Sequence, residues 1–496
     1  MNKFQRNAAV MALSAIIGGS ALLPYQTQAA KLAPVADVQL AAVKNFEAQY
    51  SDAIKHLQDK GVLQGYEDGQ IRPNKPVTNA ELLKMVLLTL DLEVTDAADT
   101  EPNAKWYDAY VASAVAQGLI AEDGKLQPNK PAEAADTAAI LAKALQRDTK
   151  SVLHWIDGLS IAGNHLTRGE MAELLVQSEK AVRSEDARIV SMRALNKVAL
   201  EITFDAPLVL EDESRDAMSD NFAFEPDLKL VNQPRLKTGS LATYIIPMQT
   251  MPDGETMTLT YKGEQTVSFN TSDKLIPLRE ARQVTSDTFE IESLRQDGVI
   301  DYGYVISAYA GGRGSDAIVL DENNSYDGQS LEIIPSLATR TAVLTPDNGE
   351  PITVSYVGFT QSTDGKQEPK FRLPQGQTLQ PGTTYTVTSD WFTVEHASFV
   401  AEEIDPLIIS SVQAVDGKTL QVTLSGDPGD ELFAYRSIQL TGDDGSTLTA
   451  QYKVQSRQGA VGTFEIGEGT LGEGVRYTIS PAGTWAVADD DMMLDK

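Results

Sequence analysis

A motif that occurs twice with the same internal spacing constrains this chain more than any other feature. Residues 67–76 read Glu-Asp-Gly-Gln-Ile-Arg-Pro-Asn-Lys-Pro, and residues 122–131 read Glu-Asp-Gly-Lys-Leu-Gln-Pro-Asn-Lys-Pro. Each copy lies between two stretches whose apolar residues recur at helical spacing. A repeated unit of this kind cannot bury its apolar face alone, so neighbouring copies must pack together. The sequence therefore predicts units of helix, turn, loop and helix that form one bundle.

The second helix of a unit begins with a recognisable signal. Thr78-Asn79-Ala80-Glu81 fits a capping box, in which the threonine and glutamate side chains satisfy backbone N–H groups at the helix start. Thr167-Arg168-Gly169-Glu170 repeats the pattern and indicates a third unit, whose front half is expected to be shortened. The middle unit carries Glu133 and Asp136 at these positions and loses the box. The units predicted within residues 31–183 span approximately 46–92, 101–148 and 150–182.

The pattern changes after residue 183. Val198, Leu200, Ile202 and Phe204 alternate with polar or small residues, which is typical of a half-buried strand. Related segments return further along the chain, and Asp-Gly and Asn-Gly turns separate the strand-like runs. Short strands with such turns predict β-sandwiches of about 100 residues. The expected fold class is multidomain, α then β, with sandwiches at 184–272, 273–401 and 402–496.

Composition and the first residues indicate where the protein resides. Residues 1–30 combine two basic residues, an apolar run and small residues at the end, which predicts a secretory signal peptide. No later stretch is apolar enough to insert into a membrane. The chain has no cysteine, which excludes disulfides, thiolate catalysis and zinc–thiolate sites. Its net charge of -29, of which residues 184–496 carry -25, argues against binding to nucleic acid.

The repeated motif resembles a known family. Gly65-Tyr66-Glu67-Asp68-Gly69, followed by Pro73 and the Thr78–Glu81 box, is similar to the S-layer homology (SLH) domain, and Leu166-Thr167-Arg168-Gly169-Glu170 resembles its usual helix start. The resemblance implies a three-unit SLH bundle that binds a secondary cell-wall polysaccharide, often pyruvylated, without a covalent bond. The blocks that follow resemble bacterial immunoglobulin-like (Ig-like) domains of S-layer proteins.

The resemblance implies a set of residues for glycan binding. The motif arginine is kept at Arg168, while Asn79 and Ala134 stand at the matching positions of the other units. An arginine beside a free helix N-terminus is also suited to a carboxylate or phosphate. The competing interpretation pairs Arg168 with Glu170 or Glu173. The candidate glycan-binding residues are Arg168, Thr167, Glu170, Trp155, Asn79, Glu81, Asp68 and Gly69, for which helix capping, turn formation and core packing are the alternatives.

A catalytic centre is not evident, and one metal site is a candidate. The four histidines form no HExxH motif and no obvious triad. Asp321, Asn323, Asp327 and Glu332 stand at calcium-loop positions 1, 3, 7 and 12, although Tyr326 occupies the position that requires glycine. Calcium is therefore the one cofactor considered, and cations could also bridge acidic neighbouring copies.

These observations favour a secreted S-layer protein of the cell wall that is not an enzyme. Residues 31–183 are expected to bind the wall glycan, and the sandwiches to self-associate into a two-dimensional lattice. Two alternatives remain open: a monomeric wall-anchored adhesin or binding protein, and a wall-anchored enzyme acting on glycans. The first would form no ordered sheets, and the second would need a cleft with closely spaced carboxylates.

Overall fold

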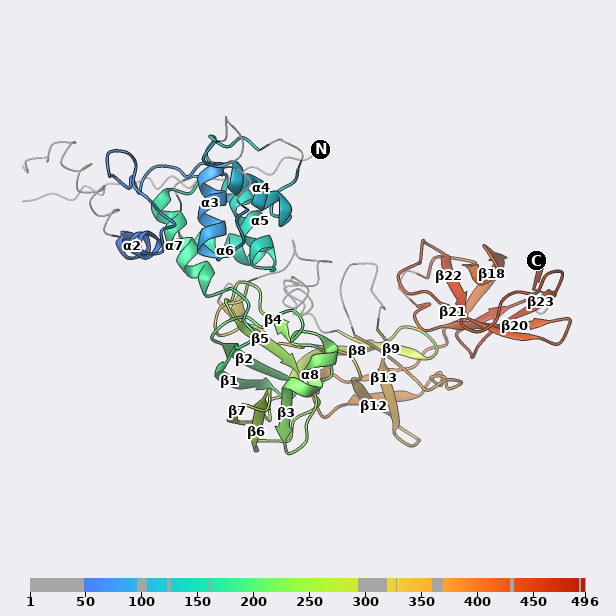
Figure 1. The fold of residues 1–496 in the computed structure, drawn as a ribbon. Helices are drawn as coiled ribbons and strands as arrows, with labels where there is room; N and C mark the ends of the chain where they lie inside the picture. Colours follow the sequence, from blue (N-terminus) through green and yellow to red (C-terminus); the bar gives the residue numbers. More distant parts are fainter. Residues whose placement is uncertain are drawn as a thin grey trace, which may run out of the picture. The chain divides into compact units, whose positions relative to one another are not determined.

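The computed structural model describes residues 49–95, 105–122, 126–159, 161, 163–292, 319–326, 328–358, 369–428, 432–489 and 492–495. The predicted signal peptide, residues 1–30, lies outside them. Helices occupy the N-terminal part and β-sheets the remainder, so the α-then-β order is confirmed (Figure 1). In the described part of the chain, no helix is both long and apolar enough to cross a membrane.

Among the described residues, six helices form the N-terminal bundle. They are α2 (Ser51–Asp59), α3 (Asn79–Thr89), α4 (Asp108–Ala116), α5 (Ala134–Ala144), α6 (Thr149–Gly158) and α7 (Arg168–Glu179). The front half of the third unit is shortened as expected, but not in its helix, because α6 has 10 residues, against nine each in α2 and α4. The connection is what is shortened, because α7 begins ten residues after the end of α6 and lacks the repeated motif.

Three short backbone pairings link the segments before α3, α5 and α7 in a cycle. Pro76 pairs with Thr167, Thr78 with Pro131, and Glu133 with His165. Each helix-start segment therefore contacts both of the others. This cyclic pairing places the repeated loop of one unit against the helix start of another unit.

The proline-bounded loops cap their neighbours' helices. Pro73 and Lys75 accept hydrogen bonds, both 2.9 Å long, from the N–H groups of Gly169 and Arg168 at the start of α7. The equivalent carbonyls of the second motif, at residues 128 and 130, accept from residues 80 and 79 at the start of α3. The first N–H groups of a helix have no partner within it. The repeated Pro-Asn-Lys-Pro segment therefore supplies the acceptors that these N–H groups need.

Side chains complete two of the three helix starts. Both predicted capping boxes are confirmed: Thr78 with Glu81 at α3, and Thr167 with Glu170 at α7. Glu133 is the N-cap of α5 and makes no side-chain capping bond. The middle helix start is thus the weakest of the three, as the loss of its threonine predicts.

The β-region contains three blocks of strands and a short helix, α8 (Arg215–Asn221). The first block consists of β1 (Ile189–Asn196), β2 (Ala199–Phe204), β3 (Phe222–Glu225), β4 (Arg235–Leu236), β5 (Thr243–Pro247), β6 (Thr256–Tyr261) and β7 (Gln265–Asn270). The second consists of β8 (Ile276–Gln283), β9 (Thr288–Ile291), β12 (Thr341–Pro346), β13 (Ile352–Tyr356), β14 (Lys370–Arg372), β15 (Thr384–Thr388), β16 (Phe392–His396) and β17 (Ser398–Val400). The third consists of β18 (Leu407–Ala414), β19 (Thr419–Leu424), β20 (Ser437–Gly442), β21 (Thr447–Tyr452), β22 (Val461–Ile466), β23 (Arg476–Pro481), β24 (Ala486–Ala488) and β25 (Met493–Asp495). A separate hairpin pairs β10 (Ser325–Tyr326) with β11 (Gln329–Ser330).

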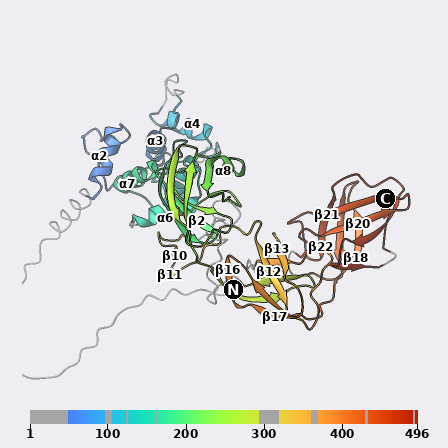
Figure 2. The same cartoon turned by 90° about the horizontal axis from the view of Figure 1, so that it is seen from below.

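The second and third blocks share one topology. When strands are numbered along each block, the spatial order is 7-1-2-5-4-3-6-8 in both. The first block keeps the same neighbours, divided into a sheet of order 1-2-5-4 and another of order 3-6-7. Its last strand takes the place of strand 8, and it has no counterpart of strand 7 among the described residues. Figure 2 labels β18, β20, β21 and β22 of the third block.

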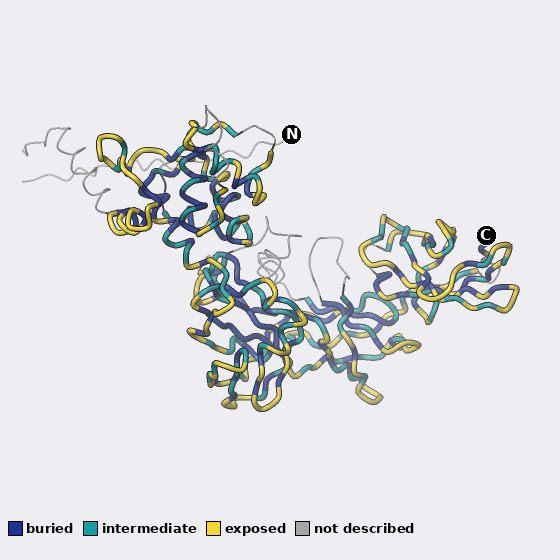
Figure 3. The backbone as a smooth tube through the Cα atoms, in the orientation of Figure 1, coloured by how far each residue is buried: buried dark blue, intermediate teal, exposed yellow. Residues whose placement is uncertain are grey.

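In each block the two sides of the strand order come together at their ends, because β1 lies near β7 in the first block; β8, next to the end strand β16, lies near β17 in the second; and β18, next to the end strand β24, lies near β25 in the third. The strands therefore enclose a core. Alternate residues of β6, β19 and β20 are buried, which is the period-two pattern of a sheet with one face inward. Figure 3 shows buried backbone running through the strands of each block and through the middle helices of the bundle. Each block has its own buried cluster, which includes Tyr244 in the first block, Phe371 in the second and Phe464 in the third.

The capping arrangement gives a first prediction. Thr167→Ala should lower the free energy of unfolding of the bundle by about 1 kcal/mol, because the N–H of Glu170 loses its side-chain acceptor. Glu133→Thr should raise it by about 0.5–1 kcal/mol, since it introduces the missing cap at α5. Urea denaturation, monitored by the far-ultraviolet circular dichroism signal of the helices, measures both changes in the free energy of unfolding. Equal stability of all three proteins would show that side-chain caps contribute nothing here.

Candidate functional site

A cluster of cations lies between the first repeated motif and the start of α7. We call Arg72, Lys75, Lys84 and Arg168, together with the Tyr66 ring, the basic cluster. Two carboxylates, Asp68 and Glu81, accompany the four cations, so the local charge is positive in a chain whose net charge is -29. The pairing of Pro76 with Thr167 brings the two segments together.

Arg168 forms the buried base of the basic cluster and is 5% exposed. Its Nη1 donates to Glu81 Oε1 at 2.7 Å, its Nε to the carbonyl of Ile71 at 2.9 Å, and its Nη2 to the carbonyl of Gln64 at 2.8 Å. Each guanidinium nitrogen therefore has a protein acceptor. Arg168 pairs with Glu81 of another unit, and neither Glu170 nor Glu173 is its partner in these bonds.

The Tyr66 ring organises the cations around it. The guanidinium carbons of Arg72 and Arg168 lie 4.5 and 4.9 Å from its centroid, and Lys75 Nζ lies at 4.5 Å, which are cation–π distances. Lys75 also donates to the Tyr66 hydroxyl at 2.9 Å, and that hydroxyl donates to Glu81 Oε1 at 3.1 Å. Three cations and one carboxylate are thus connected through one aromatic side chain.

The pKa values of Glu81 and Lys84 are both lowered, for different reasons. Burial favours the neutral form of Glu81, but hydrogen bonds from Thr78 and the charge of Arg168 outweigh it and lower the pKa of this carboxyl. Burial lowers the pKa of Lys84, and the positive charge of Arg168 adds to that shift. Glu81 is therefore held as a carboxylate, while a cation beside Arg168 is destabilised. An added anion would relieve this excess of positive charge.

The outer part of the basic cluster faces solvent. Arg72 and Lys75 are exposed, and Arg72 donates to Asp68 in an ion pair of 2.7 Å. Exposed ion pairs contribute little to stability and exchange partners readily. Arg72 and Lys75 are therefore the cations that an incoming anion could reach without unfolding the bundle.

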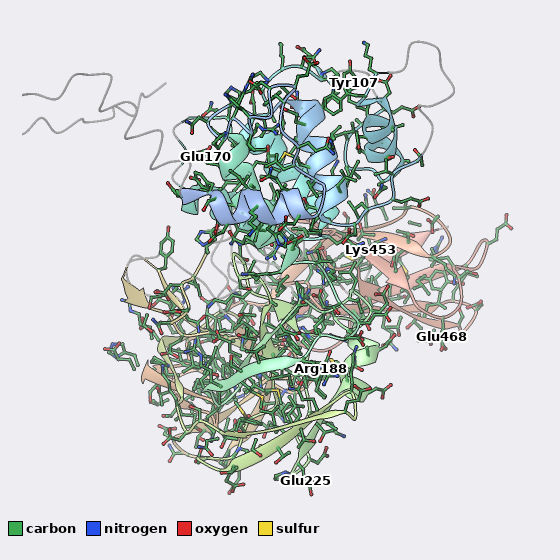
Figure 4. The ribbon with its side chains drawn as sticks, turned by 60° about the vertical axis from the view of Figure 1, so that its left-hand side comes forward. Tyr107, Glu170, Arg188, Glu225, Lys453 and Glu468 are labelled. Carbon is green, nitrogen blue, oxygen red and sulfur yellow. The ribbon has the colours of Figure 1, made fainter. Side chains whose placement is uncertain are left out.

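The candidate residues predicted from the sequence fall into separate places. Arg168, Glu81 and Asp68 belong to the basic cluster or its rim, and Gly69 forms the adjoining turn with φ of +77°. Thr167 and Glu170 form the capping box of α7; Glu170 is labelled in Figure 4. Asn79 lies at a different junction, where its side chain donates to the carbonyl of Gln127 at 3.0 Å. Their role in glycan binding stays a prediction.

The N-terminus of α7 is not free. The N–H groups of residues 168, 169 and 170 donate to Lys75, Pro73 and the Thr167 hydroxyl. The argument that a bare helix terminus beside Arg168 receives an anion is therefore wrong. The first N–H groups of α7 are not available to an anion.

Trp155 is not part of the basic cluster. It is 4% exposed, and its Nε1 donates to the carbonyl of Gly239 in the first β-block at 2.8 Å. The structure thus gives the Trp155 indole a packing role and leaves no open face for stacking on a sugar.

Sequence reasoning did not select Tyr66, Arg72, Lys75 or Lys84 as site residues. Lys75 is kept in both copies of the repeated motif and Tyr66 directly precedes the first copy, so both could have been found there. Arg72 lies inside the first copy, but a glutamine replaces it in the second, and Lys84 lies outside the motif. Only the packing of α3 and the first loop against α7 places Arg72 and Lys84 near Arg168.

The calcium candidate lies on and beside the β10–β11 hairpin. The Asp321 carboxylate accepts from the N–H groups of Asn323 and Ser325 at 2.9 and 2.7 Å, and Glu332 pairs with Lys274 at 2.5 Å. Asp327 lies outside the described residues. Among the residues that the structure describes, no three His, Cys, Asp or Glu side chains are grouped to hold a metal. Calcium binding stays a prediction.

Comparison with known proteins agrees with the bundle's motif. The family model of the S-layer homology domain matches residues 43–83, which include Tyr66 and Lys75. The S-layer protein sap of Bacillus anthracis is 24% identical over 185 residues, covering 31% of this chain and 23% of that protein. Exoglucanase XynX of Acetivibrio thermocellus is 26% identical over 161 residues, covering 28% of this chain and 15% of that enzyme.

A solved structure, surface layer protein SbsC domains 1–6, is 14% identical and covers 90% of this chain and 73% of that one. Its TM-score of 0.16 is too low to support an argument about the fold. The matches to the curated relatives span less than a quarter of those proteins.

These matches define a class of bacterial cell-surface protein. The chain carries an S-layer homology domain and is a relative of S-layer proteins, which are secreted and associated with the cell wall.

The geometry predicts different effects for the inner and outer cations. Arg168→Met should destabilise the bundle by about 3 kcal/mol, because it leaves the Glu81 carboxylate without its cation. Glu81→Gln in the same chain should recover much of this loss. Arg72→Ala, the matched exposed variant, should cost less than about 0.5 kcal/mol. Urea unfolding of the three variants tests this difference, and similar losses for Arg168→Met and Arg72→Ala would contradict it.

Proposed function

We propose that this protein anchors itself to the cell wall by binding an anionic secondary wall polysaccharide through three SLH units. The basic cluster is the observation that carries the proposal, because it gathers four cations in a strongly acidic chain. Arg72 and Lys75 would contact the acidic groups of the glycan, such as the carboxylate of a pyruvyl substituent. Arg168 would hold Glu81 and Tyr66 in place from beneath.

The cyclic pairing of the three helix-start segments supports the three-unit arrangement. The grooves between units are not equivalent in charge. Lys130 corresponds to Lys75, but Gln127 replaces Arg72, and Asn79 replaces Arg168 at the second junction. We infer that the junction containing the basic cluster binds the glycan most strongly.

Wall binding is tested with the full chain and purified cell-wall sacculi. The Arg72→Ala/Lys75→Ala double variant should bind at least about tenfold more weakly, because it removes two charge-assisted contacts while leaving the fold intact. Lys453→Ala, which removes an exposed cation of the third block, is the matched control and should pellet like the unmodified protein. Walls stripped of their secondary polymer should pellet none of them.

Two results would count against the anchor. One is failure of the unmodified protein to pellet with intact walls. The other is equal binding by the double variant, which would place the contact elsewhere on the chain.

We further propose that the three β-blocks are Ig-like domains that assemble laterally into a surface lattice. The shared strand order supports their origin as repeated domains, and the similarity to S-layer proteins supports assembly. A net charge of -25 on residues 184–496 opposes close packing of copies unless cations intervene.

Lattice formation predicts a dependence on calcium. Negative-stain images of the full chain should show ordered sheets when calcium is added and dispersed particles after chelation, because divalent cations bridge carboxylates of neighbouring copies. Magnesium at equal ionic strength controls for screening. Dispersed particles under every condition would favour a monomeric wall-anchored adhesin.

An enzyme is the remaining alternative, and the similarity to an exoglucanase keeps it open. That match covers 15% of the exoglucanase, so it does not transfer the enzyme's activity. The S-layer relatives match a similar share of this chain, so the similarity to an exoglucanase does not favour an enzyme over an S-layer protein. We propose a structural role because the basic cluster offers binding chemistry.

A further inference from the structure

Three of the chain's four tryptophans lie beside an arginine whose side chain bonds to a different part of the fold, in each case another β-block. Each carries an arginine over its ring: Arg147 over Trp155 at 4.5 Å, Arg340 over Trp391 at 5.6 Å, and Arg436 over Trp485 at 5.9 Å. These tryptophans are buried. The fourth, Trp106, is 56% exposed beside Tyr107, which Figure 4 labels.

Arg340 and Arg436 hold equivalent positions in the second and third β-blocks. Each directly precedes the third strand of its block, β12 or β20. The Nε of each donates to the carbonyl four residues earlier, at 3.2 and 3.3 Å. The indole N–H of Trp391 or Trp485 donates to the carbonyl of the residue after the arginine, at 3.1 Å in both blocks. The arginine and tryptophan are thus one repeated element of the fold.

The guanidinium tips reach into the preceding block. Arg340 Nη2 donates to the carbonyl of Met248 at 2.6 Å, just after β5 of the first block. Arg436 makes a bidentate pair with Asp287, at 2.7 and 2.8 Å, in the turn between β8 and β9 of the second block. Bidentate pairing fixes direction as well as distance.

The bundle meets the first β-block through the same residue types. Arg147 Nη2 donates to the carbonyl of Ser240 at 2.7 Å, and Trp155 Nε1 donates to that of Gly239 at 2.8 Å. The N–H of Gly239 in turn donates to the Ser151 hydroxyl at 2.8 Å. Gly239 has φ of +82°, and a Cβ there would lie 2.4 Å from Val319, so this position requires glycine.

Burial makes these contacts sensitive to loss of a partner. Burial lowers the pKa of Arg147 and of Arg340 to about 10. Burial opposes ionisation of Asp287, but its hydrogen bonds with Arg436 prevail and lower its pKa to about 2. Removing one partner of a buried charge pair costs more than the pair itself contributes.

We propose that the three arginine–tryptophan contacts are joints that couple the bundle and the three β-blocks into one stiff body. Linked domains move relative to each other by default unless their interface holds them. The joints would instead hold the third block in a fixed orientation relative to the bundle. This inference does not depend on what the bundle binds.

The absence of cysteine makes the test direct, because paired cysteines can be introduced for spin labels without background. Exposed positions for labels are Glu173 in the bundle and Ser268, Glu395 and Gln413 in the first, second and third blocks. Pulsed electron–electron double resonance on the full chain, with labels on two neighbouring parts at a time, should give a narrow distance distribution for each pair of labels. Arg147→Ala, Arg340→Ala and Arg436→Ala should each roughly double the width across their own joint and leave the other two unchanged.

Two controls separate a loosened joint from a damaged module. A label pair at Gln413 and Thr449, both within the third block, should stay narrow in Arg436→Ala. Lys453→Ala should leave every width unchanged, since this exposed cation pairs with Glu465 inside the third block. Broad distributions in the unmodified protein, or arginine variants that leave the widths unchanged, would overturn the proposal.

Discussion

The bundle depends on how the first N–H groups of its helices find acceptors. A helix start buried against another segment must satisfy these groups without water. The Pro-Asn-Lys-Pro loops deliver carbonyls to helices of other units, so α3 and α7 are each completed by a loop outside their own unit. No unit is complete by itself, and the three segments therefore close into a cycle.

That cycle also creates the basic cluster. When the first loop caps α7, it brings Tyr66, Arg72 and Lys75 over Arg168, whose guanidinium then pairs with Glu81 of α3. The buried ion pair is tolerated because every nitrogen of Arg168 has an acceptor. The same loop therefore caps α7 and carries the proposed glycan contacts. Buried Arg168 supports the exposed Arg72 and Lys75.

The second and third β-blocks share one strand order but bond to the preceding block through different residues. The second and third blocks keep the same strand order and the same arginine–tryptophan element, although their receiving residues differ: a backbone carbonyl at Met248 and a carboxylate at Asp287. The sequence showed strands and turns in each block but gave no sign of these contacts. Arg436 and Asp287 are 149 residues apart, and periodicity carries no information about a pairing over that distance.

The sequence by itself determined the α-then-β order, the capping boxes at Thr78 and Thr167, and the repeated loop, because these depend on short-range spacing. Tertiary structure alone decided that Arg168 is buried, that the start of α7 is already capped, and that Trp155 packs against Gly239. Each of these outcomes depends on which backbone carbonyl from a distant segment reaches a donor. Local pattern sets where donors and acceptors lie along the chain, but only packing selects their partners.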